Sequence, residues 1–238
     1  MSDIDVHKKR PRIFVNAPID EGVDIALSPL QSHYFHNVMR QKNGALIRIF
    51  NGSDGEWCAA IGDLSKRSGV LKPTEQIKAQ DAPQKDITLM FAPIKKNRLD
   101  FLIEKAVELG VSQFQPILTQ NTEVRKLNTD RVQAQIIEAT EQCERLNIPL
   151  LLPFCDLVTA LRAHDNIYAA IERNEDAPHI QQITDSAKCA LLIGPEGGFT
   201  AKEVEIISTQ TAVHPVSLGP RILRAETAAL YGLAYLNR

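Results

Sequence analysis

The fold is decided by a stretch near the C-terminus, Leu191-Leu192-Ile193-Gly194-Pro195-Glu196-Gly197-Gly198-Phe199-Thr200. Its apolar start predicts the end of a buried strand, and its glycines permit positive φ and a close approach of backbone to a ligand. Thr200 followed by Glu203 fits a capping box, which predicts a helix start. By itself, this strand, glycine loop and capped helix form either a tight connection or one wall of a pocket.

A second stretch of the same kind follows, Leu218-Gly219-Pro220-Arg221-Ile222-Leu223-Arg224-Ala225-Glu226-Thr227. Two glycine-bearing turns after two strands predict a pocket made mostly of backbone, of the kind that holds a cofactor. The sequence contains neither a P-loop nor a G-x-G-x-x-G fingerprint, which disfavours ATP hydrolysis and Rossmann dinucleotide binding. The helix expected after the second turn is apolar on most sides, which indicates burial in the core or against a second subunit.

Strands and helices alternate along the C-terminal part of the chain. Leu99, Leu102, Ile103, Ala106 and Val107 fall on one helix face, and Gly110 ends that helix. The other elements expected here are strands over 87–92, 114–118, 167–171, 190–193 and 213–218, and a helix over 128–146. This alternation predicts an α/β domain with a largely parallel sheet.

The N-terminal part has a different pattern, in which short strands dominate residues 12–73. A hairpin is expected between 45–50 and 57–61, because Asn51-Gly52-Ser53-Asp54-Gly55 is a dense turn signal. A short helix is expected around 33–40, and the whole resembles a small β-barrel. The predicted organisation is a barrel over 1–77, a polar linker over 78–86 and an α/β domain over 87–238.

Composition excludes several classes of protein. The 238 residues are 44% apolar and 24% charged, an ordinary globular balance. The net charge of −2 does not by itself indicate a protein that binds nucleic acid. The four cysteines form no C-x-x-C pair, so neither disulfides nor a metal site is expected. The charged N-terminus lacks the apolar core of a signal peptide, and no apolar run is long enough for a membrane span. We therefore expect a cytoplasmic protein.

Four motifs in a fixed order carry a resemblance to a known family. The first two are Glu104-Lys105-x-x-Glu108-Leu109-Gly110-Val111 and Glu138-Ala139-x-Glu141-Gln142-Cys143-x-Arg145. The others lie in the two glycine stretches, as Gly194-Pro195-Glu196-Gly197-Gly198-Phe199 and Leu218-Gly219-x-Arg221-Ile222-Leu223-Arg224-x-Glu226-Thr227-Ala228. Together these motifs span most of residues 90–238 and resemble the RsmE family, whereas the N-terminal match is looser.

The resemblance implies a SPOUT-class methyltransferase that uses S-adenosylmethionine. It implies a parallel-sheet domain with a C-terminal trefoil knot, a PUA-like N-terminal barrel and a homodimer. Family members methylate N3 of a uridine in the decoding region of 16S rRNA, which makes the small ribosomal subunit the expected partner. Gln120 and Asn121 stand where relatives often carry Glu-Arg, and Glu144 stands where many carry Gly, so no RNA contact is assigned to Gln120 or Asn121.

Site residues follow from the two glycine stretches. The cofactor contacts are expected, mainly through backbone atoms, at Leu192, Gly194, Glu196, Gly197, Gly198, Leu218, Gly219, Ile222, Leu223 and Thr227. Arg224 is the first catalytic candidate, because a cation stabilises the charge that develops on the uracil oxygens when the N3 proton leaves. Glu226 is the second candidate, because a carboxylate can take that proton. In the alternative reading, Glu196 and Glu226 only stabilise their loops, and Arg224 forms an ion pair with Glu226. No general base is assigned.

Two basic clusters are candidates for RNA contact. Lys95, Lys96 and Arg98 lie at a helix start, where cations oppose the helix dipole and bound phosphate would explain them. Arg10 and Arg12 lie at the entry to the barrel and could bind the RNA backbone. The alternative reading is a solvated loop for the first cluster and a charged tail for the second.

Two further functions stay open from the sequence alone. One is a SPOUT methylase that acts on tRNA or on a ribose 2′-hydroxyl. The other is a non-catalytic ribosome-binding module, against which the two intact glycine loops argue.

Overall fold

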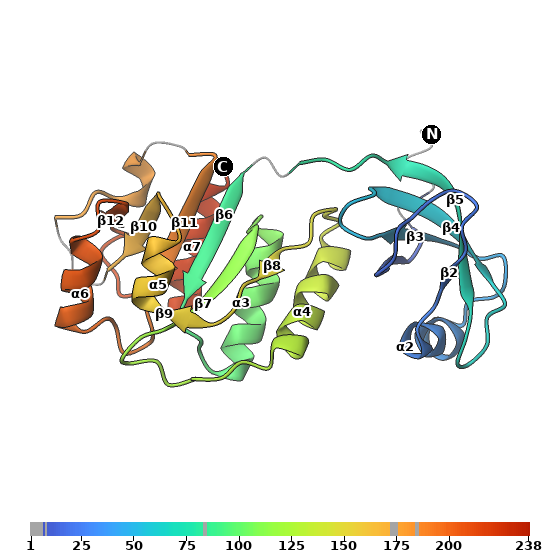
Figure 1. Cartoon of the computed structure of the whole chain (residues 1–238), viewed down its shortest axis with the longest axis horizontal. Helices are drawn as coiled ribbons and strands as arrows, with labels where there is room; N and C mark the ends of the chain where they lie inside the picture. Colours follow the sequence, from blue (N-terminus) through green and yellow to red (C-terminus); the bar gives the residue numbers. More distant parts are fainter. Residues whose placement is uncertain (1–6, 8, 83–84, 172–175, 184–185) are drawn as a thin grey trace. The chain divides into compact units, whose positions relative to one another are not determined.

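The computed structural model describes residues 7, 9–82, 85–171, 176–183 and 186–238 (Figure 1). The chain forms two compact units. The N-terminal unit contains the described residues up to Ala82 together with Glu144–Asn147. The C-terminal unit contains the described residues from Lys85 to Cys143 and from Ile148 to Arg238. The second unit therefore donates a four-residue segment of chain to the first.

The N-terminal unit is built on a curled, mixed sheet with strand order β1-β3-β4-β5-β2. Its strands are β1 (Arg12–Phe14), β2 (Ile25–Ala26), β3 (Leu46–Phe50), β4 (Glu56–Gly62) and β5 (Val70–Lys78). Register shifts between β4 and β5 bend this sheet, as β-bulges do. The outer strands β1 and β2 pair with no further strand among the described residues, so the expected barrel is an open, curled sheet.

The β3–β4 hairpin is confirmed, and its turn is fixed by side chains that bond the backbone. The Asn51 amide oxygen accepts hydrogen bonds from the backbone N–H groups of Ser53 and Asp54 at 3.0 and 2.8 Å. Asp54 Oδ2 accepts from the backbone N–H of Ile19 at 2.9 Å, and this bond is the main cause of the lowered pKa of Asp54. Gly55 follows with φ +78, where an added Cβ would lie 2.3 Å from the Lys78 carbonyl oxygen.

A short helix is present, but it lies over residues 29–38 rather than around 33–40, and it has two turns of different geometry. Helix α2 (Pro29–His33) begins at a capping box formed by Ser28 and Gln31. The wider π-helical element η1 (Tyr34–Val38) continues it. Phe35 is buried against the sheet, in a core that also contains Ile13, Ile25, Ile47, Ile49, Ile61 and Leu71.

The C-terminal unit contains a parallel sheet with order β12-β10-β11-β6-β7-β8, and a short strand β9 that pairs with β7. Its strands are β6 (Asp86–Phe91), β7 (Gln113–Leu118), β8 (Leu150–Leu151), β9 (Cys155–Asp156), β10 (Ile167–Ala170), β11 (Lys188–Ile193) and β12 (Val213–Val216). Every pairing between these strands is parallel, which confirms the predicted sheet.

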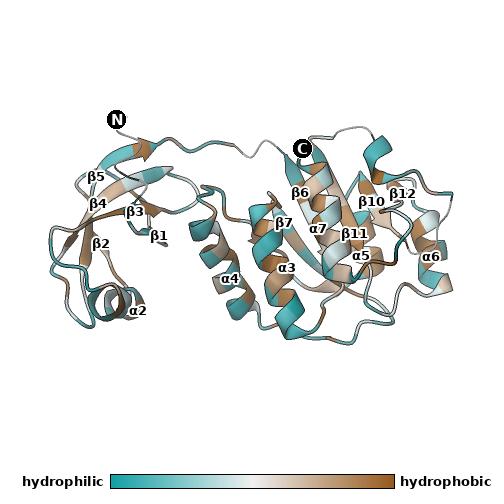
Figure 2. Cartoon of the chain, turned by 180° about the vertical axis from the view of Figure 1, so that it is seen from behind, coloured by the Kyte–Doolittle hydropathy of each residue, from teal (hydrophilic) through white to brown (hydrophobic). Residues whose placement is uncertain are grey.

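Helices cover both faces of this sheet because alternate strand residues point to opposite sides. Leu89 and Leu191 belong to the core beneath α3 (Lys96–Glu108), α4 (Thr129–Gln142) and α7 (Ala225–Leu236). Met90 and Leu192 belong to the opposite core, which includes residues of α5 (Leu157–Arg162) and α6 (Ala201–Ser208). Figure 2 shows α3, α4 and α7 on one face. No helix in the described part of the chain has the length and apolar character needed to span a bilayer.

Some boundaries differ from the sequence expectation. Helix α4 ends at Gln142 rather than residue 146, because Glu144 has φ +60 and leaves helical geometry. Strand β5 reaches Lys78 and β6 begins at Asp86, so both ends of the expected linker are strand residues. Residues 83 and 84 of that linker lie outside the described residues. The trefoil knot and the domain boundaries stay predictions.

Candidate active site

A cavity of about 1070 Å³ lies beyond the carboxyl ends of β10, β11 and β12. In parallel α/β sheets, ligands bind at this edge. The two glycine stretches supply most of its wall, and residues from α3, α6, α7 and the segment before η2 (Ile180–Gln182) complete it. The lining includes Ala170, His179, Val204, Val216 and Ala228 in addition to the two loops.

The first loop, Gly194–Phe199, follows β11 and is braced by side chains. An added Cβ on Gly194 would lie 2.8 Å from the Phe199 ring, so a larger residue would have to displace that ring. Gly198 has φ +69, and the Asn121 amide donates to the carbonyls of Gly197 and Gly198 at 3.1 and 3.0 Å. Asn121 therefore holds the loop, a role that the sequence pattern did not suggest.

Helix α6 begins directly after this loop, as expected. Thr200 and Glu203 form the predicted capping box. Glu203 also accepts a hydrogen bond from the backbone N–H of Gln120 at 2.8 Å. The loop is thus fixed both by the helix that follows it and by the segment after β7.

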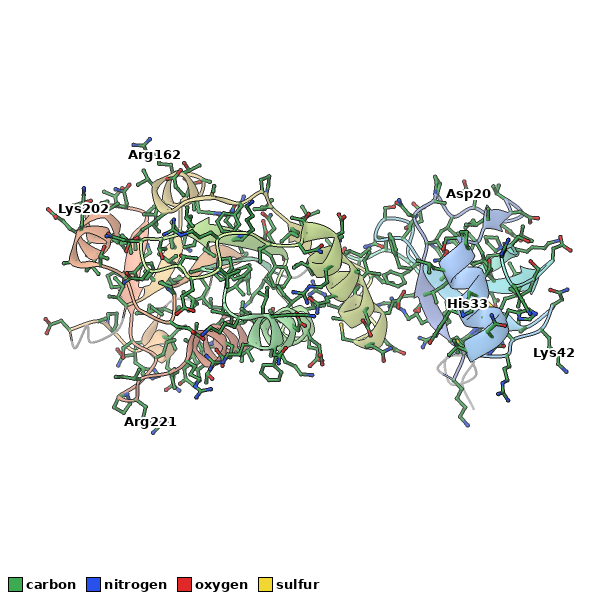
Figure 3. The ribbon with its side chains drawn as sticks, turned by 90° about the horizontal axis from the view of Figure 1, so that it is seen from below. Asp20, His33, Lys42, Arg162, Lys202 and Arg221 are labelled. Atoms are coloured by element: carbon green, nitrogen blue, oxygen red, sulfur yellow. The ribbon has the colours of Figure 1, made fainter. Side chains whose placement is uncertain are left out.

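The second loop runs from Ser217 to Arg224 and joins β12 to α7. Gly219 has φ +105, a conformation that an L-residue rarely adopts, and an added Cβ would meet nothing closer than His179 Nε2 at 3.9 Å. Its backbone therefore faces open space on the cavity side of the loop. Arg221 of the same loop also lines the cavity; Figure 3 labels it.

The structure brings together eight of the expected cofactor residues. They are Gly194, Glu196, Gly197, Gly198, Leu218, Gly219, Ile222 and Leu223. Leu192 and Thr227 do not line the cavity. The Leu192 side chain is fully buried in the core on the opposite face of the sheet, and Thr227 lies on the exposed surface of α7.

A charged cluster stands at the cavity wall. Arg98 lines the cavity, pairs through its guanidinium with Glu196, and places Nε 3.8 Å from Glu226 Oε1. Glu226 Oε2 is buried and has no hydrogen-bond partner among the described residues. Arg98, expected at bound phosphate, instead lies between two carboxylates, one from the first loop and one from the first turn of α7.

The ion pair between Arg224 and Glu226 that the sequence left open does not form among the described residues. Arg224 is the N-cap residue of α7, is exposed, and lines the cavity. No ion pair to Arg224 is found within the described ranges, and the cation next to Glu226 is Arg98. The Arg224 guanidinium is therefore accessible to a ligand in the cavity.

The other residues expected at RNA have varied surroundings. Lys95 Nζ lies 3.4 Å from Glu123 Oε2, and Lys96 is exposed at the first turn of α3. Arg12 is enclosed: its Nε donates to Glu56 at 2.6 Å, and its guanidinium lies 3.7 Å above the Phe50 ring. Burial lowers the pKa of Arg12, while the Glu56 carboxylate acts in the opposite direction.

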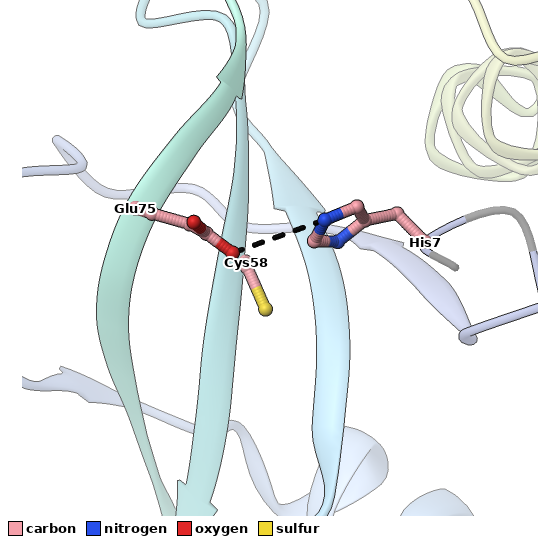
Figure 4. A group of neighbouring side chains, drawn as sticks. All are labelled: His7, Cys58 and Glu75. Carbon is pink, nitrogen blue, oxygen red and sulfur yellow. Dashed lines mark ion pairs between the residues drawn. The ribbon is translucent and has the colours of Figure 1, made fainter. Parts of the chain in front are cut away.

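Arg10 is also engaged inside the N-terminal unit. Its guanidinium lies 2.7 Å from His7 Nδ1 and donates to Cys58 Sγ at 3.0 Å. His7, Cys58 and Glu75 have ligand atoms within 4.8 Å of one another, and His7 Nε2 lies 3.9 Å from Glu75 (Figure 4). The permanent charge of Arg10 at this cluster opposes a bound metal ion. We therefore assign no metal to it.

Two family models match the chain. An RNA methyltransferase domain covers residues 80–237, and an RNA methyltransferase PUA domain covers residues 31–74. Among curated proteins, the chain is 35% identical to the Ribosomal RNA small subunit methyltransferase E of Rickettsia conorii, over 96% of both chains. It is 31% identical to the protein of the same name from Synechocystis, over 90% of this chain and 72% of that one.

Solved structures agree with the sequence relatives. A Ribosomal RNA small subunit methyltransferase E from Neisseria gonorrhoeae, bound to S-adenosyl methionine, matches with a TM-score of 0.83 and 29% identity. That match covers 94% of this chain and 95% of the other. A Legionella pneumophila protein in complex with the same cofactor matches with a TM-score of 0.86 and 28% identity, over 96% and 97% of the two chains. The chain therefore belongs to the RsmE family of ribosomal RNA small subunit methyltransferases.

Proposed function

We propose that this protein transfers a methyl group from S-adenosylmethionine to N3 of a uridine in 16S rRNA. The observation that carries the proposal is the cavity between the two glycine loops, at the carboxyl ends of β11 and β12. Its volume of about 1070 Å³ can enclose a cofactor together with a flipped base. We propose uridine 1498 on the small ribosomal subunit as the site of methylation, because the resemblance to the RsmE family implies that target.

The residues of the cavity fit this cofactor. Gly198 and Gly219 leave backbone without side chains at the wall, so peptide groups can approach the adenosyl and amino-acid parts closely. Apolar surface comes from Leu218, Ile222 and Leu223. Leu192 and Thr227 remain proposed cofactor contacts, although neither residue lines the cavity.

The chemistry asks mainly for orientation and charge stabilisation. S-adenosylmethionine supplies a methyl group on a sulfonium, which is already activated. The exposed guanidinium of Arg224 stabilises the negative charge on the uracil oxygens as the N3 proton leaves. Glu226 does not line the cavity and contacts Arg98, so we give it a positioning role rather than direct contact with the base.

Assembly and location extend the proposal. We propose a homodimer, because Phe101 of α3, Ile222 of the second loop and Tyr231 of α7 are large apolar residues that stay exposed in the single chain. A substrate in the ribosome implies that the protein acts in the cytoplasm. Analytical ultracentrifugation measures the mass in solution, and a monomer at all concentrations would contradict the proposed homodimer.

The decisive experiment offers the purified chain and methyl-labelled S-adenosylmethionine to naked 16S rRNA, isolated small subunits and tRNA. Methylated nucleotides are then mapped by mass spectrometry. We expect N3-methyluridine at one position of 16S rRNA. Label confined to tRNA or to a ribose hydroxyl would contradict the proposal. Cofactor binding without any methyl transfer would favour the non-catalytic module.

A further inference from the structure

The cavity has a third wall that neither glycine loop supplies. It is the segment 178–180, which leads into η2 and lies alongside the start of the second loop. The Ser217 backbone N–H donates to the Pro178 carbonyl, and the Ile180 backbone N–H donates to the Ser217 carbonyl, both at 2.9 Å. His179 lies opposite Ser217 in this parallel bridge and lines the cavity. The pairing therefore fixes His179 against the second loop.

The His179 imidazole presents one unused donor beside Gly219. Its Nδ1 accepts a hydrogen bond from the Gln181 backbone N–H at 3.2 Å. A ring nitrogen that accepts carries no proton, so the neutral ring carries its proton on Nε2. Nε2 lies 3.9 Å from the position that a Cβ on Gly219 would take, and it has no acceptor in the described part of the chain. Because Gly219 has no side chain, a ligand can reach this N–H across the loop.

Helix α7 holds the His179 ring in place. Tyr231 contacts the ring edge to face, with centroids 6.3 Å apart and an interplanar angle of 85°. One turn later, the Tyr235 hydroxyl donates to the Gln181 carbonyl at 2.9 Å. Gln181 is also the residue that bonds His179 Nδ1, so α7 fixes both the ring and its backbone partner. A donor that is fixed before the ligand arrives loses little entropy on binding.

We infer that His179 is a specificity residue for the cofactor, and that its Nε2–H donates to an acceptor in the adenosyl part of S-adenosylmethionine. Ala170 and Val216 are paired across β10 and β12, directly before the bridge, and both line the cavity. This apolar wall suits a purine nucleoside better than the carboxylate of the amino-acid part. The inference rests on the proposed use of this cofactor. It differs from a histidine that only packs on Tyr231 and caps η2.

The test uses the full chain and two probes, S-adenosylhomocysteine and 5′-methylthioadenosine, which lacks the amino-acid part. Calorimetry measures both affinities. In His179→Asn, the amide oxygen replaces Nδ1 as the acceptor for Gln181, but no donor reaches the Nε2 position. This variant should bind both probes about fivefold more weakly. In His179→Gln, the longer amide returns a donor to the Nε2 position, so both affinities should stay close to those of the parent chain.

His214→Asn is the matched control. His214 is an exposed histidine whose ring lies 6.0 Å from the Tyr168 ring, and it does not line the cavity. This change should leave both affinities as they are in the parent chain. Thermal unfolding of all three variants checks that each folds as the parent chain does.

The order of the two His179 variants separates a ligand donor from a structural role. Asparagine caps helices well, so a histidine that only caps η2 would tolerate His179→Asn and lose more in His179→Gln. That order, or equal affinities in His179→Asn and the parent chain, would overturn the inference. Weaker binding of S-adenosylhomocysteine alone would place the acceptor in the amino-acid part and would also overturn it.

Failure of the inference and failure of the proposed function give different results. A parent chain that binds neither probe would reject both. Binding of both probes by the parent chain, with methyl label confined to tRNA, would reject the proposed function, while the His179 variants still decide the inference. Methylation of 16S rRNA with unchanged probe affinity in His179→Asn would reject only the inference.

Discussion

At the scale of single residues, the cavity depends on backbone conformations that favour glycine. Gly198 has φ +69 at the wall, so Gly198→Val should lower cofactor affinity by about tenfold or more while the fold persists. Calorimetry measures the affinity. Gly44→Ala is the matched control, because Gly44 has φ +84 with open space around it and lies in the other unit. Equal affinity of both variants would contradict the assignment of the pocket.

Arg224 gives a second prediction at this scale. Its guanidinium is accessible, and its proposed partners are the uracil oxygens in the transition state. Arg224→Ala should therefore lower kcat by about 10²-fold and change the cofactor Kd little. Arg162→Ala, an exposed arginine at the end of α5, should change neither quantity (Figure 3). Parallel losses in kcat and cofactor affinity would show that Arg224 only maintains the pocket.

Arg98 contributes to stability because its cation lies next to the buried Glu226 carboxylate. Its removal strands the buried Glu226 carboxylate, so Arg98→Ala should destabilise the protein by about 1–2 kcal/mol, an estimate reduced for the partial exposure of Arg98. Adding Glu226→Gln should restore most of that loss. Urea unfolding measures both variants. A double variant as unstable as Arg98→Ala would mean that Glu226 carries no stranded charge.

The sequence was most informative about the residues of the two loops and least informative about their partners. The glycine spacing predicted eight residues that line the cavity. It could not reveal that Arg98, Asn121 and His179 lie beside the loops, because each comes from a different element and only the folded sheet brings it there. The Leu192 side chain points to the opposite face of the sheet, so the contact expected there stays a prediction about its backbone.

At the scale of elements, the periodicity of apolar residues predicted the parallel sheet and its main helices. The hairpin was predictable because Asn51 acts locally, through side-chain bonds to the backbone N–H groups of Ser53 and Asp54. The short strands β2, β8 and β9 were not, since two residues show no period. The end of α4 was missed because the positive φ of Glu144 depends on contacts within the N-terminal unit, such as the Arg48–Glu144 ion pair at 2.7 Å.

Close packing of α7 on β11 gives a prediction at the element scale. An added Cβ on Gly232 would lie 2.6 Å from Leu191 Cδ2, in a fully buried region. Gly232→Val should destabilise the protein by about 1–3 kcal/mol, despite the poor helix propensity of glycine. Thermal and urea unfolding measure this effect, with exposed Thr227→Val on the same helix as control. A neutral Gly232→Val would show that Leu191 moves aside freely.

At the scale of the whole molecule, the N-terminal unit is not a continuous piece of sequence. Glu144–Asn147 supplies partners to it: Arg12 donates to the Arg145 carbonyl at 2.6 Å, and Gln80 donates to Asn147 at 2.7 Å. A fragment that ends at Ala82 should therefore unfold at lower urea than the same unit in the full chain. Trp57, the single tryptophan, reports this transition by fluorescence. Identical midpoints would contradict the prediction.

The returning segment also has a consequence for biosynthesis. A nascent chain emerges from the ribosome in order, and N-terminal domains generally fold first. Here the first unit has to wait for Asn147, by which time β6, α3, β7 and α4 have already been synthesised. The buried arginines Arg12 and Arg48 lack some of their acceptors during that interval. Folding of the N-terminal sheet during synthesis thus depends on a later segment of the same polypeptide. A fusion protein that contains only residues up to 82 would lack Glu144–Asn147 and would therefore carry an incomplete N-terminal unit.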